Sequence, residues 1–267
     1  MERAIGVFDS GVGGLTVLNS IRTLLPNENI IYIGDNYHCP YGEKTREQLF
    51  SYASEIVEYF IKENVKLIVL ACNTTSATVL NELQAVYKEV LIIGVIDATV
   101  EDFISRGVDN TLVIATAATI NSHKYPDTID CYQTGIEVFT LPTPKLVPLV
   151  EAGMDKKDIY DVLHEYLDSY AGKIKSIILG CTHYPILENQ IKDILPDIEY
   201  ISSSDAVCKN VRDVLIKNNL LNLNKNKFIK IYTTGRVDEF LKSSTGFFDY
   251  TDLVVAVSYT HLTLPTT

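Results

Sequence analysis

Short apolar runs alternate with longer amphipathic stretches along most of the chain. The runs are bounded by glycine, proline, asparagine and aspartate, which is typical of buried strands. The stretches between them repeat their apolar residues with a helical period. Because strands covered on both faces read as nearly continuous apolar runs, this alternation predicts a layered α/β fold with mostly parallel sheets.

The expected elements can be given as residue ranges. Strands are predicted at 4–8, 30–33, 67–70, 91–94, 112–115, 136–140, 176–179, 199–201, 228–233 and 253–257. Helical periodicity is clearest at 46–63, 78–88, 157–169 and 189–195. The last ten residues, "SYTHLTLPTT", follow neither pattern, and we treat 258–267 as an atypical tail.

Two similar phrases stand at the ends of two of these strands. "LACNTTS" occupies 70–76 and "LGCTHYP" occupies 179–185, and each places a cysteine directly after an apolar run. The repeat predicts two pseudo-symmetric α/β domains with an active site in the cleft between them. We expect residues 1–97 plus 208–257 to form the first domain, with Cys72, and residues 98–207 to form the second, with Cys181.

Composition and charge exclude several classes of function. The formal net charge is −11, which argues against a surface for nucleic acid or anionic lipid. No apolar run approaches the ~18 residues of a membrane span, and no signal-peptide pattern opens the chain, so we expect a cytoplasmic protein. The five cysteines are widely spaced without a CxxC pair, which indicates neither a disulfide framework nor a metal site.

The glycine-rich stretch "FDSGVGGLTV" at 8–17 invites a nucleotide-binding interpretation, but its spacing disagrees. Thr16 stands where the third glycine of G-x-G-x-x-G belongs, and no G-K-[ST] follows. Asp35, after the second predicted strand, imitates a ribose-binding acid only superficially. We expect the glycines to form a tight turn that needs positive φ.

The carboxyl ends of parallel strands meet where open α/β sheets bind ligands, so the residues there carry the chemistry. Asp9, Cys72 and Cys181 each end a predicted strand. "CNTTSATVL" has the content of a helix start, and a helix N-terminus lowers the pKa of a thiol. A nucleophilic hydrolase needs one activated cysteine. Two equivalent cysteines suit proton transfer between the two faces of one carbon, with one thiolate removing a proton and the opposite thiol delivering one.

The chain resembles the cofactor-independent glutamate racemases of the aspartate/glutamate racemase family over nearly its whole length. The resemblance rests on ordered motifs: "IGVFDSGVGGLTVL", "IYIGDNYHCPYGEKT", "LACNTTSA", "ATAATINSHKY", "PLVEAG" and "LGCTHYPIL". It implies interconversion of L- and D-glutamate, without pyridoxal phosphate or metal, to supply D-glutamate for peptidoglycan synthesis. It also implies a homodimer.

The resemblance assigns roles to individual residues. Cys72 matches the base that acts on D-glutamate and Cys181 the base that acts on L-glutamate. Asp9 matches a side chain that assists the first thiol, and His183 and Glu151 match those near the second. The implied substrate contacts are Asp9 and Ser10 for the ammonium, Asn73, Thr74 and either Thr116 or Thr119 for the α-carboxylate, and Tyr41, Gly42 and Thr182 for the side-chain carboxylate, with Pro40 shaping the turn. His183 is also expected to contact the substrate.

The chain departs from the family pattern in a few places, and other functions stay open. "GVIDATV" at 94–100 lacks the usual proline and glycine, and Ala115 replaces a usual glycine, which could crowd a backbone approach. The first strand begins close to Met1, so we expect activity without a nucleotide-sugar activator. The alternatives are an aspartate or hydantoin racemase, a binder of acidic amino acids, and a thiol hydrolase using Cys181 and His183, although residues two apart on a helix start do not normally face each other.

Overall fold

The computed structural model describes residues 3–133, 135–153, 156–224, 227–251 and 253–255, and its strands form two sheets. All pairings are parallel. The first sheet contains β1 (Ile5–Asp9), β2 (Ile30–Gly34), β3 (Leu67–Leu70), β4 (Leu91–Gly94), β9 (Ile229–Thr233) and β10 (Val254–Val255). The second contains β5 (Asn110–Ala115), β6 (Glu137–Pro142), β7 (Ser176–Gly180) and β8 (Glu199–Ser202). Each predicted strand is confirmed; residues 256–257 and the 258–267 tail lie outside the described residues.

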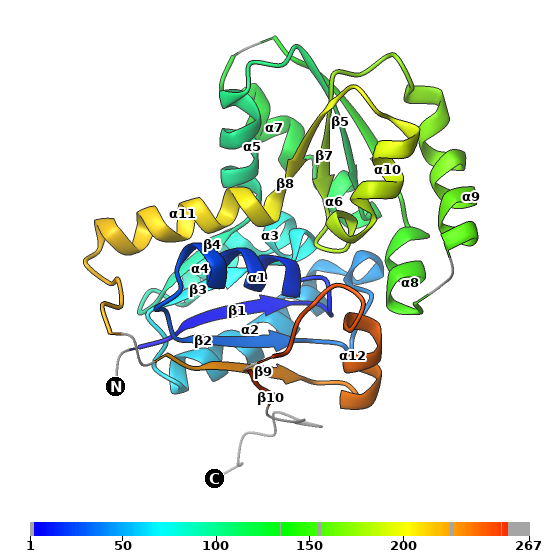
Figure 1. Cartoon of the computed structure of the whole chain (residues 1–267). Coiled ribbons are helices and arrows are strands. Elements are labelled where there is room, and N and C mark those ends of the chain that lie inside the picture. Colours follow the sequence, from blue (N-terminus) through cyan, green and yellow to red (C-terminus); the bar gives the residue numbers. More distant parts are fainter. Residues whose placement is uncertain (1–2, 134, 154–155, 225–226, 252, 256–267) are drawn as a thin grey trace.

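The order of strands repeats between the two sheets. The first sheet runs β10-β9-β2-β1-β3-β4 and the second β6-β5-β7-β8, so the second, first, third and fourth strands of each half are neighbours in the same sequence. Cys72 follows β3 and Cys181 follows β7, which are the equivalent third strands. The two halves are therefore related in topology as the repeated cysteine phrase predicts (Figure 1).

Helices cover the sheets and connect their strands. The predicted helices are confirmed with ends that differ by at most two residues, as α2 (Arg46–Lys62), α4 (Leu80–Val86), α9 (Lys156–Leu167) and α10 (Glu188–Ile194). The remaining α-helices are α1 (Leu15–Leu24), α3 (Asn73–Thr78), α5 (Ile96–Ser105), α6 (Ala117–Asn121), α7 (Lys124–Asp130), α8 (Leu146–Glu151), α11 (Ser203–Lys217) and α12 (Val237–Ser244). Short 3₁₀ turns occupy η1 (Tyr41–Glu43), η2 (Asp168–Tyr170) and η3 (Tyr184–Leu187).

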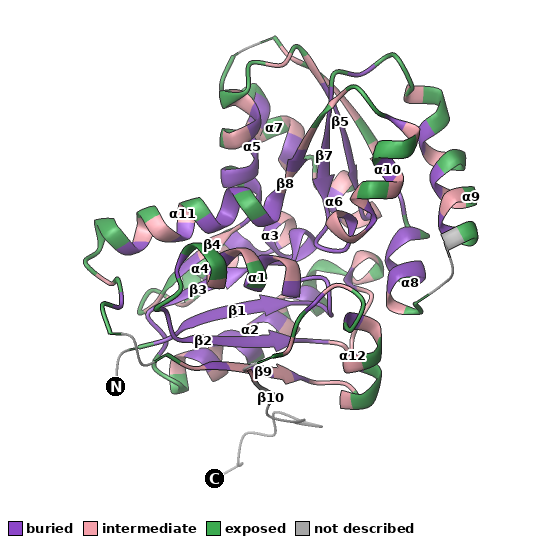
Figure 2. Ribbon diagram, in the orientation of Figure 1, coloured by how far each residue is buried: buried purple, intermediate pink, exposed green. Residues whose placement is uncertain are grey.

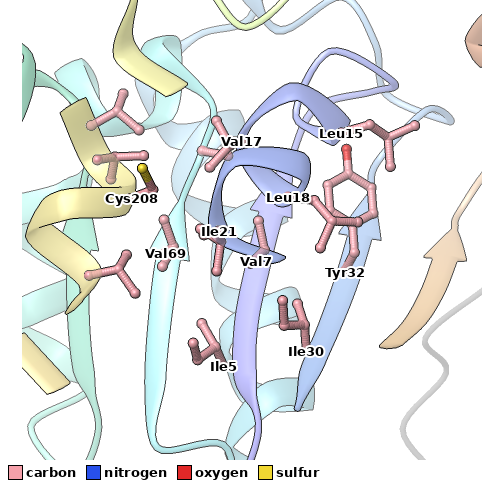
Figure 3. Packing of buried hydrophobic residues seen from close by; sticks show 14 of the residues in the cluster. Ile5, Val7, Leu15, Val17, Leu18, Ile21, Ile30, Tyr32, Val69 and Cys208 are labelled. Carbon is pink, nitrogen blue, oxygen red and sulfur yellow. The ribbon is translucent and has the colours of Figure 1, made fainter. Parts of the chain in front are cut away.

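Local sequence explains where these helices begin and which face they bury. Thr45 caps α2 and exchanges bonds with Gln48 in a capping box, which satisfies two amides at the helix start. In α1, Leu18 and Ile21 are three residues apart and turn the same face inward, where they lie against Ile5 and Val7 of β1 (Figure 3). A buried cluster thus joins the first helix to the sheet.

The chain passes between the halves at α5 and α11. The predicted crossing near Asp97 falls in α5, and the predicted return near residues 204–208 falls in α11. These two helices pack against each other, and α11 also packs on α1, so buried side chains continue through the junction (Figure 2). The domain limits themselves stay a prediction. Within the described ranges, every helix is too short or too polar to cross a membrane.

A buried ion pair holds the segment after α11, at residues 220–222, against the first sheet. Lys66 Nζ lies 2.5 Å from Glu28 Oε2, and both side chains are at most 3% exposed. Lys66 also donates to the carbonyl of Leu220, while Glu28 accepts from the amide of Asn222. The charges are therefore both paired and hydrogen-bonded, which a buried pair requires.

We expect Lys66→Met to lower the free energy of unfolding by about 3–5 kcal/mol, because it leaves the Glu28 carboxylate buried without its partner. Urea denaturation measures this loss. Lys145→Met removes the exposed pair with Glu165 and serves as the matched control, for which we expect no measurable loss. Equal midpoints for the two variants would contradict the assigned role of the buried pair.

Candidate active site

The site lies where the carboxyl ends of the two sheets face each other. In each half, the second strand lies on one side of the first strand and the third strand lies on the other side. The point between the first and third strands, β1 and β3 or β5 and β7, is therefore a topological switch point. A cavity of about 50 Å³ lies there, and residues from both halves line it. Its walls are Ser10, Pro40, Tyr41, Gly42, Glu43, Cys72, Asn73, Thr74, Thr116, Ala117, Pro144, Val147, Cys181, Thr182 and His183.

Asp9 lies directly behind this cavity and holds the loop after β1. Its Oδ2 accepts from the amides of Gly11 (3.0 Å) and Gly14 (2.9 Å), and its Oδ1 accepts from the Thr182 hydroxyl at 3.1 Å. The carboxylate is fully buried, and this burial raises its pKa despite the nearby His183 and the three bonds. Asp9 thus joins the first half to the second.

The glycines of this loop serve close approach rather than positive φ, so that expectation is wrong. Their φ angles lie outside the left-handed region. A Cβ at Gly13 would lie 2.5 Å from His183 Nδ1, and one at Gly11 would lie 2.4 Å from Glu151 Oε1. A larger residue at either position would require a side chain of the second half to shift, Glu151 for Gly11 and His183 for Gly13.

Cys72 is the N-cap residue of α3, as its sequence context predicts, and its sulfur lies 3.7 Å from Ser10 Oγ. The expected lowering of its pKa is wrong for this protein. Burial and the negative charge of Asp9 raise the pKa of Cys72 to about 11. Hydrogen bonds from Thr75 and Ser10 favour the thiolate but do not outweigh these effects. Cys72 is therefore a neutral thiol at physiological pH.

Cys181, His183 and Glu151 form a connected chain on the opposite side. Cys181 Sγ lies 3.7 Å from His183 Nδ1, and His183 Nε2 lies 2.7 Å from Glu151 Oε1. Burial opposes a charged imidazole, but the bonds to Cys181 and Glu151 prevail and raise the pKa of His183 well above its ordinary value. The objection that Cys181 and His183 would not face each other is wrong, because both precede the η3 turn, outside regular helix.

Hydroxyl and amide groups from both halves meet beside the thiols. Thr74 Oγ1 lies 2.9 Å from Thr116 Oγ1 and 3.3 Å from Thr119 Oγ1. Asn73 is held through its amide, which accepts from the Tyr125 hydroxyl at 2.7 Å and donates to Ser203 Oγ at 3.3 Å. These buried groups supply donors for an anionic ligand.

The loop after β2 brings Tyr41 and Gly42 to the cavity. Asp35 anchors this loop, because its carboxylate accepts from the hydroxyls of Tyr41 and Thr234 at 2.5 Å and lies 2.8 Å from His38 Nδ1. Asp35 therefore holds this loop in place. A Cβ at Gly42 would lie 2.8 Å from Thr116 Cβ, so glycine permits this contact between the halves.

The structure brings most of the expected site residues to one place. Asp9, Thr119 and Glu151 are the three that do not line the cavity, and each contacts a residue that does. Ala115 causes no crowding, because its partner across β5 and β7 is Gly180. Further residues at the cavity or in contact with its walls had no expected role: Glu43, Ala117, Pro144, Val147, Tyr125 and Ser203. Of these, Glu43, Ala117 and Tyr125 stand within the quoted motifs, which is the only sequence signal that could have found them.

Comparison with known proteins agrees with this geometry. The sequence profile of the Asp/Glu/Hydantoin racemase family matches residues 5–211. The chain belongs to this family. Among curated members, it is 39% identical over 226 residues to a glutamate racemase of Clostridium perfringens, covering 84% of this chain and 87% of that one. It is 36% identical to a glutamate racemase of Streptococcus mutans, covering 98% of this chain and 99% of that one.

Solved structures of this racemase family share the fold over nearly the full length. A glutamate racemase isoform from Bacillus anthracis superposes with a TM-score of 0.90 at 34% identity, covering 97% of this chain and 98% of that chain. A glutamate racemase from Francisella tularensis, solved with D-glutamate, gives a TM-score of 0.88 at 36% identity, covering 96% and 97%. The two α/β halves with parallel sheets are thus a family feature.

The raised pKa of Cys72 is directly testable. We expect the ultraviolet thiolate absorbance that Cys72→Ser removes from the wild type to appear only near pH 11. Asp9→Asn removes the charge that opposes the thiolate, so it lowers this pKa. Asp130→Asn, at an exposed position at the end of α7, is the control and leaves it unchanged. A Cys72 thiolate already present at neutral pH would contradict the electrostatic description.

Proposed function

We propose that this protein interconverts L- and D-glutamate by direct proton transfer at Cα between Cys72 and Cys181. The observation that supports this most strongly is the placement of the two thiols, which follow equivalent strands of two sheets and line one cavity from opposite halves. The glutamate substrate is supported by the named relatives, among them the Francisella enzyme solved with D-glutamate.

The charge distribution suggests how one turnover begins. Cys72 carries its proton, and the His183 imidazolium next to Cys181 places a positive charge beside that sulfur. With L-glutamate, the Cys181 thiolate takes the Cα proton, and the Cys72 thiol gives its proton to the opposite face of the carbon. D-glutamate is formed, Cys181 is left as a thiol and Cys72 as a thiolate. The reverse reaction exchanges the two roles.

The intermediate requires stabilisation, because removal of the Cα proton places negative charge on the α-carboxylate as an enediolate. Asn73, Thr74 and Thr116 line the cavity with an amide and two hydroxyls, and each is at most 9% exposed. Fixed donors in a site with little water stabilise developing charge strongly. We assign the α-carboxylate to these three, with Thr119 supporting them, and the side-chain carboxylate to Tyr41, Gly42 and Thr182, with Pro40 shaping that turn. Ser10, beside Cys72, is assigned to the ammonium. Asp9 accepts a hydrogen bond from Thr182 and so positions this cavity residue.

We expect Cys72→Ser and Cys181→Ser each to reduce racemisation by about 10²-fold or more in both directions, because each removes one of the two proton-transfer groups. Circular dichroism of D- and L-glutamate follows the reaction. Cys39→Ser is the matched control, since Cys39 is also partly buried near the site but does not line the cavity, and it should retain activity.

Other outcomes separate the alternative functions. A Cys72→Ser variant that keeps full turnover indicates a thiol hydrolase built on Cys181 and His183. A wild type that binds glutamate without racemising it is a binding protein, and one that racemises aspartate or a hydantoin but not glutamate has the alternative substrate.

The burial of the site supports movement of the two halves. Cys72, Thr74 and Cys181 line the cavity, yet each is at most 6% exposed, so the surrounding residues restrict the access of a substrate from solvent. We expect the cleft to open for substrate and to close around it. Small-angle X-ray scattering should therefore give a smaller radius of gyration with saturating glutamate than without it, and identical profiles would contradict this movement.

The remaining parts of the proposal rest on the resemblance to the family. We propose that the protein is a cytoplasmic homodimer, that it needs no cofactor, and that its product supplies D-glutamate for peptidoglycan. Sedimentation velocity tests the dimer, and growth of a D-glutamate auxotroph expressing the chain tests the supply. Among the described residues, no group of three or more His, Cys, Asp or Glu side chains is placed to hold a metal ion.

A further inference from the structure

Tyr125 reaches from the second half of the molecule to a cavity residue of the first. It belongs to α7, it is 1% exposed, and its hydroxyl donates to Asn73 Oδ1 at 2.7 Å. Asn73 opens α3, directly after Cys72. The bond therefore joins elements that are 52 residues apart in sequence, and it ends on the side chain next to one of the two thiols.

The bonds of Asn73 show what this contact does. A side-chain amide has two N–H donors and one carbonyl oxygen. One donor of Nδ2 goes to Ser203 Oγ, and Oδ1 is occupied by Tyr125, which leaves one N–H for a ligand in the cavity that Asn73 lines. With the amide reversed, its oxygen would take the place of Nδ2 and would repel a carboxylate.

We propose that Tyr125 is a positioning residue for the reaction: by donating to Asn73 Oδ1, it keeps the amide nitrogen of Asn73 available to the α-carboxylate of the substrate. This inference rests on the proposed function, because it assumes an anionic group in the cavity. Tyr125 itself does not line the cavity.

The surroundings of Tyr125 suit a fixed donor. Its ring belongs to the same buried cluster as Ile129 of α7 and Phe103 of α5, so packing holds the side chain in place. Burial raises the pKa of the Tyr125 hydroxyl, so the group keeps its proton at neutral pH. Phenylalanine can occupy the same space without the hydroxyl.

The test compares Tyr125→Phe with Tyr200→Phe. Tyr200 also donates its hydroxyl to an oxygen, the carbonyl of Leu195, but it lies on β8 beside Ile177, near the start of β7 and away from the cysteines. We expect Tyr125→Phe to lower kcat/KM for both enantiomers by about three- to tenfold, the usual effect of one lost hydrogen bond, and to weaken glutamate binding in calorimetry. Tyr200→Phe should match the wild type in both.

A second measurement separates positioning from a general loss of structure. If Tyr125 acts through Asn73, the double variant with Asn73→Ala is no slower than Asn73→Ala alone, whereas independent effects multiply. Unchanged kinetics of Tyr125→Phe, or multiplied losses in the double variant, would overturn the proposal. If the wild type binds glutamate without racemising it, the proposed function fails and the binding comparison still decides the role of Tyr125; if it does not bind, both fail.

Discussion

The carboxylate of Asp9 and the glycines of the loop after β1 allow the two halves to approach closely. The site depends on this close approach. Asp9 bonds to the loop of its own half and to Thr182 of the other. Gly13 lets this loop lie against His183, where a single added carbon would be 2.5 Å from the ring. Cys72 and Cys181 can face one cavity only because these backbones approach so closely.

The same burial that joins the halves determines the charges of the site. Asp9 and Cys72 are removed from water together, so the thiol keeps its proton. On the other side, Glu151 accepts from the amide of Val12 as well as contacting His183, so an acid of the second half stabilises the imidazolium and also touches the first half. Two thiols with equivalent positions thus have different surroundings, one next to a carboxylate and the other next to a cation. The two halves therefore share a strand order but differ in the charges next to their cysteines.

Much of this could be predicted from the sequence, and the failures have physical causes. Strands were recognisable because buried parallel strands are short continuous apolar runs. The α11 helix was not predicted, although Val207, Val211 and Leu215 have helical spacing, since the predicted domain limit between residues 207 and 208 divides it. The pKa of Cys72 could not be predicted from a helix start alone, since it depends on an acid 63 positions earlier in the chain. Contacts such as Tyr125 with Asn73 depend on how two halves pack, and no local pattern specifies them.

In the proposed reaction, a proton leaves one face of Cα and another arrives on the opposite face, each carried by a cysteine that exchanges with solvent. Incubation of the purified protein with L-glutamate in D₂O, without pyridoxal phosphate, tests it most directly by following optical activity and deuterium at Cα together. We expect D-glutamate to form with deuterium at Cα, while L-glutamate recovered early in the reaction carries little. Loss of optical activity without deuterium in the product, or no change in either signal, would contradict it.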